Sequence, residues 1–182
     1  MNVVTAAEMV TRVMPARNFT VAHRRKALWI VIHTMETPEG VDTAEQVARW
    51  FASPGAPDAS AHYCIDQDSI VQCVDPIHVA WHAPGANRWG IGVEHAGRAS
   101  QTAEQWRDQA SSKILALSAR LVGQLCFEWD IAVRRIGPAE LLAGESGICG
   151  HYDVTKAFKK STHTDPGPNF PWDEYLAAAE AA

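Results

Sequence analysis

The sequence has no apolar run that approaches the roughly 20 residues of a membrane-spanning helix. Its longest strand-like apolar run, Leu28 to Ile32, is far shorter than that. Residues 1–13 mix Glu8 and Arg12 with short apolar stretches, so they lack the continuous apolar segment of a signal peptide. We therefore expect no contact with a membrane and synthesis in a cytosol.

The sequence also lacks an excess of positive charge. Sixteen Lys and Arg stand against twenty-one Asp and Glu, a formal net charge of −5. A basic footprint for nucleic acid is therefore missing. Repeats, low-complexity tracts and long linkers are missing too, so we expect a single domain over residues 1–182. Within it, residues 1–26 would form an N-terminal helix and a lead-in segment, and a monomer is the default expectation.

Cysteine is scarce and its spacing is uninformative. The sequence contains Cys64, Cys73, Cys126 and Cys149. Without a secretion signal we expect reduced, mostly buried thiols rather than disulfides. No pair has zinc-finger spacing. Eight histidines and seven tryptophans are the unusual part of the composition, and they direct the search for chemistry.

Apolar and β-branched residues predict a buried central strand at residues 27–33, which ends on a histidine. Strands and helices alternate loosely around it, which favours a mixed α/β fold with a central sheet flanked by helices. The other predicted strands are 62–65 and 70–74, which form a hairpin, and 90–95. The predicted helices are 5–14, 43–53, a long one after residue 102, 138–143 and 172–180.

Two of these helices carry the sequence signature of a capping box. Thr43 precedes Gln46 by three residues, and Thr102 precedes Gln105 by three. The long helix has an apolar stripe at steps of three or four, which predicts a face packed on the core. The stripe consists of Trp106, Ala110, Ile114, Leu117, Leu121 and Leu125.

Three segments place metal-capable groups where the backbone would expose them. His33 ends the central strand, His151 follows Gly150, and the proline-framed segment 163–168 carries His163 and Asp165. Two imidazoles and one carboxylate suit zinc and leave a fourth position open for water. Such an ion would activate water and polarise a carbonyl, as amide hydrolysis at neutral pH requires. Sequence spacing alone does not select which of these residues bind the ion.

Glu94 lies inside an apolar strand, where burial would raise its pKa toward the range of a general base. The alternative is an ordinary carboxylate paired with an arginine at the edge of the sheet.

Taken together and in order, these segments resemble the zinc-dependent N-acetylmuramoyl-L-alanine amidases of the amidase-2 family, which are related to peptidoglycan recognition proteins. The resemblance extends from about residue 27 to residue 172. The end of this stretch, residues 164–172, is similar to amidase domains of phage endolysins that attack actinobacterial walls. The segments that carry the resemblance are Trp29–His33, His62–Tyr63, Ala80–Ala83, Ile91–Glu94, Gly150–His151 and Asp165–Pro168.

The resemblance implies a mixed central sheet with helices around it and one Zn2+ per chain. It implies that His33, His151 and Asp165 are the zinc ligands and that Glu94 activates the attacking water. The substrate would be peptidoglycan, cut at the amide between N-acetylmuramic acid and the L-Ala of the stem peptide. Segments that line the family's substrate groove contain His62, Trp81 and His82.

The sequence departs from the family pattern at two positions. His163 stands two residues before Asp165, where the family often has a lysine that stabilises the oxyanion. An imidazole can also donate a hydrogen bond to a developing negative charge, so we expect His163 to take this role. Ala61 stands where another branch has a tyrosine before the strand histidine, which leaves Glu94 as the stronger candidate for the general base.

Several alternatives stay open at this point. His163 could be a ligand in place of His151, or Cys149 could compete, because zinc favours thiolates. The domain could bind muropeptides without cutting them, or it could recycle soluble muropeptides in a cytosol. Without an export signal, a phage lysin would wait in the host cytoplasm and reach the wall after the membrane is breached.

Overall fold

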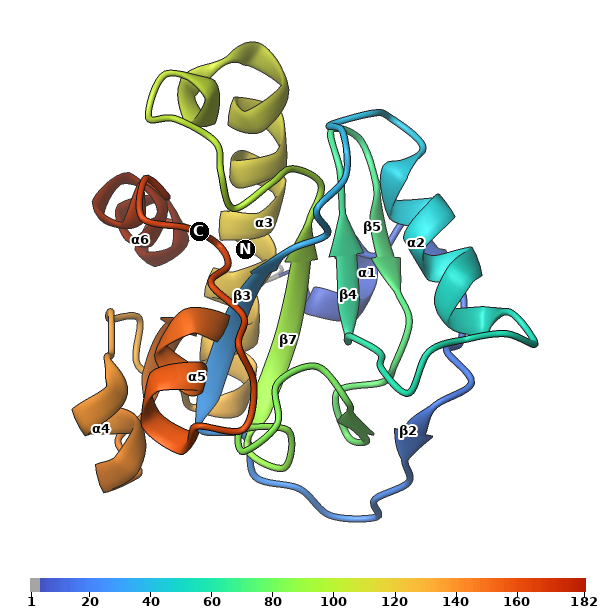
Figure 1. The fold of residues 1–182 in the computed structure, drawn as a ribbon, viewed down its shortest axis with the longest axis vertical. Coiled ribbons are helices and arrows are strands. Elements are labelled where there is room, and N and C mark those ends of the chain that lie inside the picture. Colours follow the sequence, from blue (N-terminus) through green and yellow to red (C-terminus); the bar gives the residue numbers. More distant parts are fainter. Residues whose placement is uncertain (1–3) are drawn as a thin grey trace.

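The computed structural model describes residues 4–182, so residues 1–3 of the predicted lead-in segment lie outside the described part. A six-stranded sheet forms the centre of the molecule, and a small two-stranded sheet lies beside it (Figure 1). The strands are β1 (Arg12–Val13), β2 (Phe19–Thr20), β3 (Trp29–Thr34), β4 (Tyr63–Ile65), β5 (Ile70–Gln72), β6 (Val79–Ala80), β7 (Gly90–His95) and β8 (Gly147–Gly150). The helices are α1 (Ala6–Met9), α2 (Thr43–Ala52), α3 (Gln109–Trp129), α4 (Pro138–Ala143), α5 (His151–Phe158) and α6 (Trp172–Glu180), with a 3-10 turn at Gln105–Arg107.

The central sheet is mixed, as the sequence predicts. Its strand order is β1-β5-β4-β7-β3-β8, and β3 pairs in parallel with both β7 and β8. The strands β4 and β5 form the predicted antiparallel hairpin. The register places His33 of β3 directly opposite Glu94 of β7. Both side chains therefore lie at the same level near the carboxyl ends of neighbouring parallel strands.

Successive side chains of β3 and β7 point to opposite faces of the sheet, so the core has two sides. Ile30, Ile32, Ile91 and Val93 belong to the cluster that packs on α3 and α6. Figure 1 shows α3 behind the sheet. Val31 belongs to a separate cluster with residues of α4 and α5. Because side chains alternate between the two faces of a strand, His33 and Glu94 lie on the face opposite α3.

The predicted helix at residues 5–14 is wrong beyond Met9. Thr5 and Glu8 cap the short helix α1 reciprocally, and the chain then extends into β1. The strand β1 pairs in parallel with β5, where Arg12 lies opposite Val71. Pairing with the sheet edge thus replaces the end of the predicted helix.

The capping box predicted at Thr43 and Gln46 is also wrong. The Thr43 hydroxyl donates to the Pro38 carbonyl and accepts from the Gly40 amide instead of capping α2. The amide of Ala44 donates to Asp66, which lies in the β4–β5 turn (2.9 Å). A residue remote in sequence therefore caps this helix.

The second predicted capping box forms, but it caps the short 3-10 turn that precedes α3 and not α3 itself. Thr102 and Gln105 bond reciprocally at the 3-10 turn, and α3 itself begins after Asp108, whose carboxylate accepts from the Ser111 amide (2.9 Å). The apolar stripe of α3 faces the core as predicted, with Ile114, Leu121 and Leu125 fully buried.

The four cysteines are buried free thiols, in agreement with the sequence-based expectation. The Sγ atoms of Cys64 and Cys73 lie 3.8 Å apart without a bond between them. Of the helices within residues 4–182, none combines the length and the apolar character needed to cross a membrane.

A buried histidine connects the central strand to the helices α3 and α6. His95 Nδ1 donates to the carbonyl oxygen of His33 (2.9 Å), and its Nε2 lies 2.5 Å from the hydroxyl of Ser118. That hydroxyl also contacts the hydroxyl of Tyr175 on α6 (2.6 Å). Burial lowers the pKa of His95 from 6.5 to about 4, so the imidazole is neutral in the folded protein.

This shift makes stability depend on pH. The unfolded chain binds a proton at His95 below pH 6.5 and the folded chain does not until about pH 4, so stability falls as the pH falls through this window. From pH 7 to pH 5 the loss from this residue is about 2 kcal/mol. Urea denaturation of the metal-free protein at both pH values measures it. His95→Gln should show a smaller loss over the same interval, and an equal loss would contradict this assignment.

Candidate active site

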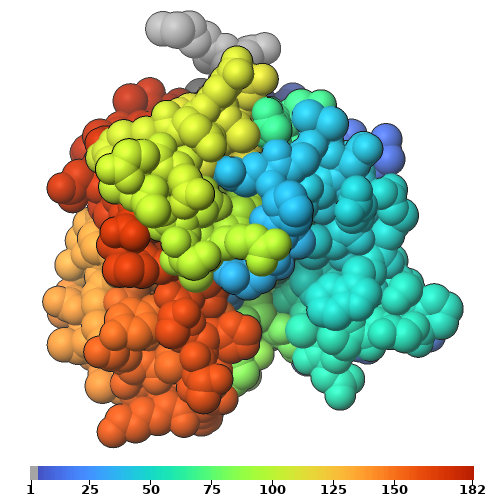
Figure 2. Space-filling view, turned by 45° about the horizontal axis from the view of Figure 1, so that its top comes forward, coloured from blue at the N-terminus to red at the C-terminus, as the bar shows by residue number. Residues whose placement is uncertain are grey.

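A cleft of about 720 Å³ opens on the face of the sheet opposite α3. Figure 2 shows it as a hollow between α2 and the segment that includes α5 and the chain after it. Its floor contains the ends of β3 and β7, and one wall is the apolar side of α2. The lining residues include His33, Glu36 and Glu94 from the floor, Val47, Trp50 and Phe51 from α2, Asp58 to Ser60, Trp81 and His82, and His151, Ser161, His163 and Asp165 on the other side.

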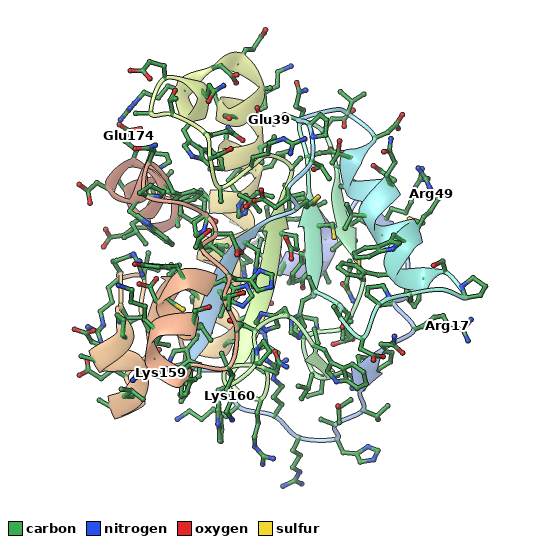
Figure 3. The ribbon with its side chains drawn as sticks, in the orientation of Figure 1. Arg17, Glu39, Arg49, Lys159, Lys160 and Glu174 are labelled. Carbon is green, nitrogen blue, oxygen red and sulfur yellow. The ribbon has the colours of Figure 1, made fainter. Side chains whose placement is uncertain are left out.

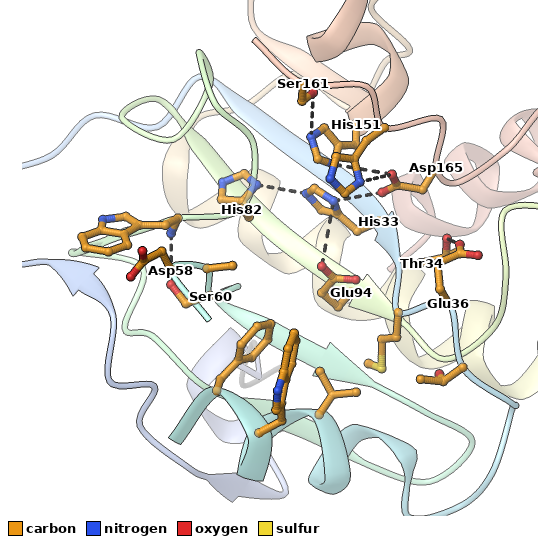
Figure 4. A pocket seen from close by; sticks show the side chains of 18 of the residues that line it. His33, Thr34, Glu36, Asp58, Ser60, His82, Glu94, His151, Ser161 and Asp165 are labelled. Atoms are coloured by element: carbon orange, nitrogen blue, oxygen red, sulfur yellow. Dashed lines mark hydrogen bonds and ion pairs between the residues drawn. The ribbon is translucent and has the colours of Figure 1, made fainter. Parts of the chain in front are cut away.

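Three side chains from remote segments converge at one end of this cleft (Figure 4). His33 ends β3, His151 is the first residue of α5, and Asp165 lies in the loop that follows α5. The Nδ1 of His33 is 3.0 Å from Asp165 Oδ2, and the Nδ1 of His151 is 3.4 Å from Asp165 Oδ1. One potential ligand atom from each residue lies within 4.8 Å of the others, and all three residues are buried.

The donor set suits a zinc ion. His151 Nδ1 is buried without a hydrogen-bond partner, so its lone pair or proton is unsatisfied by the protein. Burial alone would raise the pKa of Asp165, but the adjacent imidazoles of His151 and His33 outweigh that effect and hold the pKa well below its usual range. Burial lowers the pKa of His33. Two imidazoles and one carboxylate therefore face one point, as in three-ligand catalytic zinc sites.

The fold holds the two segments that carry His151 and Asp165 against each other. The Tyr152 amide donates to the carbonyl oxygen of Asp165 (2.9 Å), which fixes the loop on the first turn of α5. Gly167, two residues on, has φ of 89° and approaches the backbone of Ala99 so closely that a Cβ would lie 1.9 Å from its carbonyl oxygen. The loop is thus anchored on both sides of the carboxylate.

Glu94 and His163 flank this cluster. Glu94 Oε1 lies 3.9 Å from His33 Nδ1, and Oε2 is buried without a hydrogen-bond partner. Burial raises the pKa of Glu94 well above its usual value, and the negative charges of Asp165 and Glu36 raise it further. The His163 ring stacks on His151 with ring centres 4.2 Å apart, and its side chain is 62% exposed at the mouth of the cleft.

Comparison with known proteins agrees with this geometry. Residues 23–168 match the protein family Amidase_2, described as N-acetylmuramoyl-L-alanine amidase. The chain belongs to this family. N-acetylmuramoyl-L-alanine amidase A of Achromobacter lyticus is 32% identical over 154 residues, which cover 80% of this chain and 79% of the relative.

Solved structures share the amidase fold. A mutant endolysin from Bacillus subtilis superposes with a TM-score of 0.64 at 20% identity, covering 93% of this chain and 99% of that chain. A selenomethionine derivative of AmpD superposes with a TM-score of 0.66 at 19% identity, covering 92% of this chain and 93% of that chain. At these identities the likeness establishes the fold, a mixed sheet flanked by helices, which confirms the predicted fold class.

Of the three residues expected to contact substrate, Trp81 and His82 line the cleft and His62 does not. Trp81 lies at the cleft wall, where its indole N–H donates to the Thr20 hydroxyl (2.9 Å). His62 is fully buried, its Nδ1 accepts from the Gly92 amide (2.9 Å), and its Nε2 lies 2.8 Å from Arg25 Nη1. The structure therefore places His62 beneath the cleft rather than in it, which the sequence motif did not reveal.

Cys149 does not join His33, His151 and Asp165, so it does not compete for the metal as the alternative left open above would require. It lies within β8 in the cluster with Val31, whereas His151 begins α5 after the chain turns at Gly150. Among the described residues, the group that could hold a metal ion consists of His33, His151 and Asp165, without Cys149.

Two cleft features were not predicted. Ser161 Oγ lies 3.4 Å from His151 Nε2, on the side of the ring opposite the cluster. Trp50 of α2 is half exposed on the cleft wall. Lys159 and Lys160, which follow α5 and are labelled in Figure 3, are exposed and are not among the residues that line the cleft.

The close approach at Gly167 predicts that the backbone there controls the position of Asp165, and with it any metal binding by His33, His151 and Asp165. Gly167→Ala should reduce the free energy of unfolding by about 3 kcal/mol, since the new Cβ meets Ala99 and the backbone is left-handed. It should also weaken zinc binding, because the loop carries Asp165. Gly144→Ala is the matched control: φ is +72° there and a Cβ would meet nothing within 4 Å, so only about 1 kcal/mol should be lost. Urea denaturation and zinc titration measure both effects, and equal results for the two variants would contradict the coupling.

Proposed function

We propose that the protein is a zinc-dependent N-acetylmuramoyl-L-alanine amidase that cuts peptidoglycan. It would hydrolyse the amide that joins the lactyl group of N-acetylmuramic acid to the L-Ala of the stem peptide. The observation that carries this proposal is the convergence of His33, His151 and Asp165 at one end of an open cleft. The family match and the named amidase relative support it.

His33, His151 and Asp165 would hold the ion. When bound, zinc acts as a Lewis acid that polarises the scissile carbonyl and makes water a stronger nucleophile at neutral pH. The remaining chemistry belongs to the side chains around it.

Glu94 is the proposed general base. Its carboxylate lies beside the three ligands on the floor of the cleft, and its raised pKa favours accepting a proton near neutral pH. It takes a proton from the attacking water and then delivers a proton to the nitrogen of the departing L-Ala. A free carboxylate oxygen, Oε2, is available for this transfer because no protein group bonds to it.

His163 is proposed to stabilise the negative charge that develops on the carbonyl oxygen. Its ring is held by stacking on His151, and its Nδ1 lies 3.4 Å from Asp165 Oδ1. The ring is exposed to the cleft mouth, so Nε2 is free to donate a hydrogen bond to substrate. In this proposal His163 donates from one side of the cleft, opposite Glu94 on its floor.

The cleft extends from the metal cluster along α2, which leaves room for an extended peptide. Trp50 and Trp81 present aromatic surface on its walls. Such surfaces pack against sugar rings and peptide backbones. We propose that they hold the glycan and stem peptide on either side of the scissile amide, and that the enzyme is a phage endolysin that passes from the host cytoplasm to an actinobacterial wall.

The product of the reaction tests the function. Incubation with intact sacculi should release stem peptides with a new free L-Ala amine, and mass spectrometry detects this change. Chelation should abolish the release and zinc should restore it. Unchanged sacculi and unchanged soluble muropeptides would indicate a binding module, whereas cleavage of soluble fragments alone would favour muropeptide recycling.

Glu94→Gln tests the role of the base. Turnover should fall by about 100-fold or more, because the amide cannot accept the proton, while zinc content stays at the wild-type level. Glu36→Gln is the matched control, an acid in the same cleft whose Oε1 accepts from Thr34 and Ala99. It should retain most of the activity. Near-normal turnover of Glu94→Gln would remove Glu94 from the mechanism.

A further inference from the structure

His82 lies directly behind the proposed metal ligand His33. The Nε2 of His33 is 3.0 Å from the Nδ1 of His82, and the Nε2 of His82 is 3.2 Å from the carbonyl oxygen of Gly90 (Figure 4). We infer that His82 is a positioning residue that fixes the protonation pattern of His33 for metal binding. This inference rests on the zinc site of the proposed function.

His33, His82 and the Gly90 carbonyl form a row of hydrogen-bonded groups. The positions of the protons in this row follow from the Gly90 carbonyl at its end. A backbone carbonyl can only accept, so the Nε2 of His82 carries the proton and donates it to Gly90. The Nδ1 of a neutral His82 then holds a lone pair, and it accepts from the Nε2–H of His33. His33 is left with a lone pair on Nδ1, the nitrogen that faces Asp165 and His151.

The other protonation pattern of His33 would not bind the ion. A proton on Nδ1 would point at Asp165 Oδ2 and occupy the metal-facing position with a hydrogen bond. The row through His82 therefore selects the metal-binding form before any ion arrives. Partners of this kind on the second nitrogen of a histidine ligand fix its tautomer and the orientation of its ring.

Two glycines of strand β7 leave the space that the His82 ring occupies. A Cβ on Gly92 would lie 2.5 Å from His82 Cγ and 2.7 Å from its Nδ1, and a Cβ on Gly90 would lie 3.2 Å from its Cε1. Both glycines lie on the same face of β7 as Glu94, because alternate residues share a face. The absence of side chains at these two positions makes the space in which the imidazole lies.

The backbone of His82 is fixed as well. The amides of His82 and Ala83 both donate to Oδ1 of Asn87, at 3.0 and 2.6 Å. Only 8% of the residue is exposed and both ring nitrogens have protein partners, so substrate has no free nitrogen to contact. This reassigns His82 from the substrate contact expected from the sequence to support of the metal ligand.

Zinc affinity of purified variants tests the inference, measured by competition with a chromophoric chelator. His82→Phe keeps a ring of similar size and removes the acceptor, so zinc should bind about 10- to 100-fold more weakly. His82→Asn restores an acceptor near the position of Nδ1 and should recover part of the loss. Wild-type protein that binds no zinc would contradict the proposed function, whereas wild-type binding that His82→Phe leaves unchanged would overturn this inference alone.

A pair of glycine variants tests the packing of the His82 ring against β7 without altering His82. Gly92→Ala should weaken zinc binding because its Cβ displaces the ring. Gly147→Ala on β8 is equally crowded, with a Cβ 2.6 Å from Ile136 Cγ2, but it touches no part of the row. It should reduce stability and leave zinc affinity within about twofold of wild type. Equal zinc affinities in both variants would overturn the inference, and comparison at equal folded fraction by circular dichroism separates affinity from unfolding.

The tautomer itself can be read in the metal-free protein by 15N NMR of the imidazole rings. His33 should show a protonated Nε2 and an unprotonated Nδ1 in wild type, and His82→Phe should lose this preference. A merely structural role for His82 would leave the His33 tautomer unchanged. A protonated Nδ1 on His33 in wild type, or a variant that changes KM for substrate but not zinc affinity, would overturn the inference.

Discussion

The site depends on placing three electron-pair donors at one point inside the protein. His33 and His151 turn Nδ1 toward the same carboxylate, Asp165, and one of these nitrogens has no hydrogen-bond partner. Buried polar atoms without partners are costly, and a divalent cation at this point would satisfy all three groups at once. The strand end, the helix start and the loop that carry these residues are arranged so that this meeting occurs at the end of a cleft.

The parallel pairing of β3 with β7 supplies most of this arrangement. It brings His33 level with Glu94, and it places Gly92 beside the ligand strand so that His82 can lie against its face. The proposed ligand His33 and the proposed base Glu94 thus lie on one side of two adjacent strands, and His82, from the loop before β7, packs against that side. The opposite side of the same strands is apolar and packs on α3, which gives these polar groups a rigid base.

The sequence predicted the fold class, the central strand and the long helix because hydrophobic periodicity reports burial directly. It failed where a remote residue replaced a local one: Asp66 caps α2 in place of Thr43, and pairing of β1 with the sheet edge ended the first helix early. The order of short motifs indicated His33, His151 and Asp165, although spacing alone could not bring them together. It could not distinguish residues in the cleft from residues beneath it, because strand-to-loop geometry decides whether His62 and His82 face solvent.

The most direct measurement is a crystal structure of the zinc-loaded protein with anomalous diffraction recorded on both sides of the zinc absorption edge. The account predicts one strong zinc peak per chain, within about 2.0–2.2 Å of Nδ1 of His33, Nδ1 of His151 and an oxygen of Asp165. A peak bonded to other residues, or zinc-saturated crystals in which these three side chains bind no ion, would contradict it.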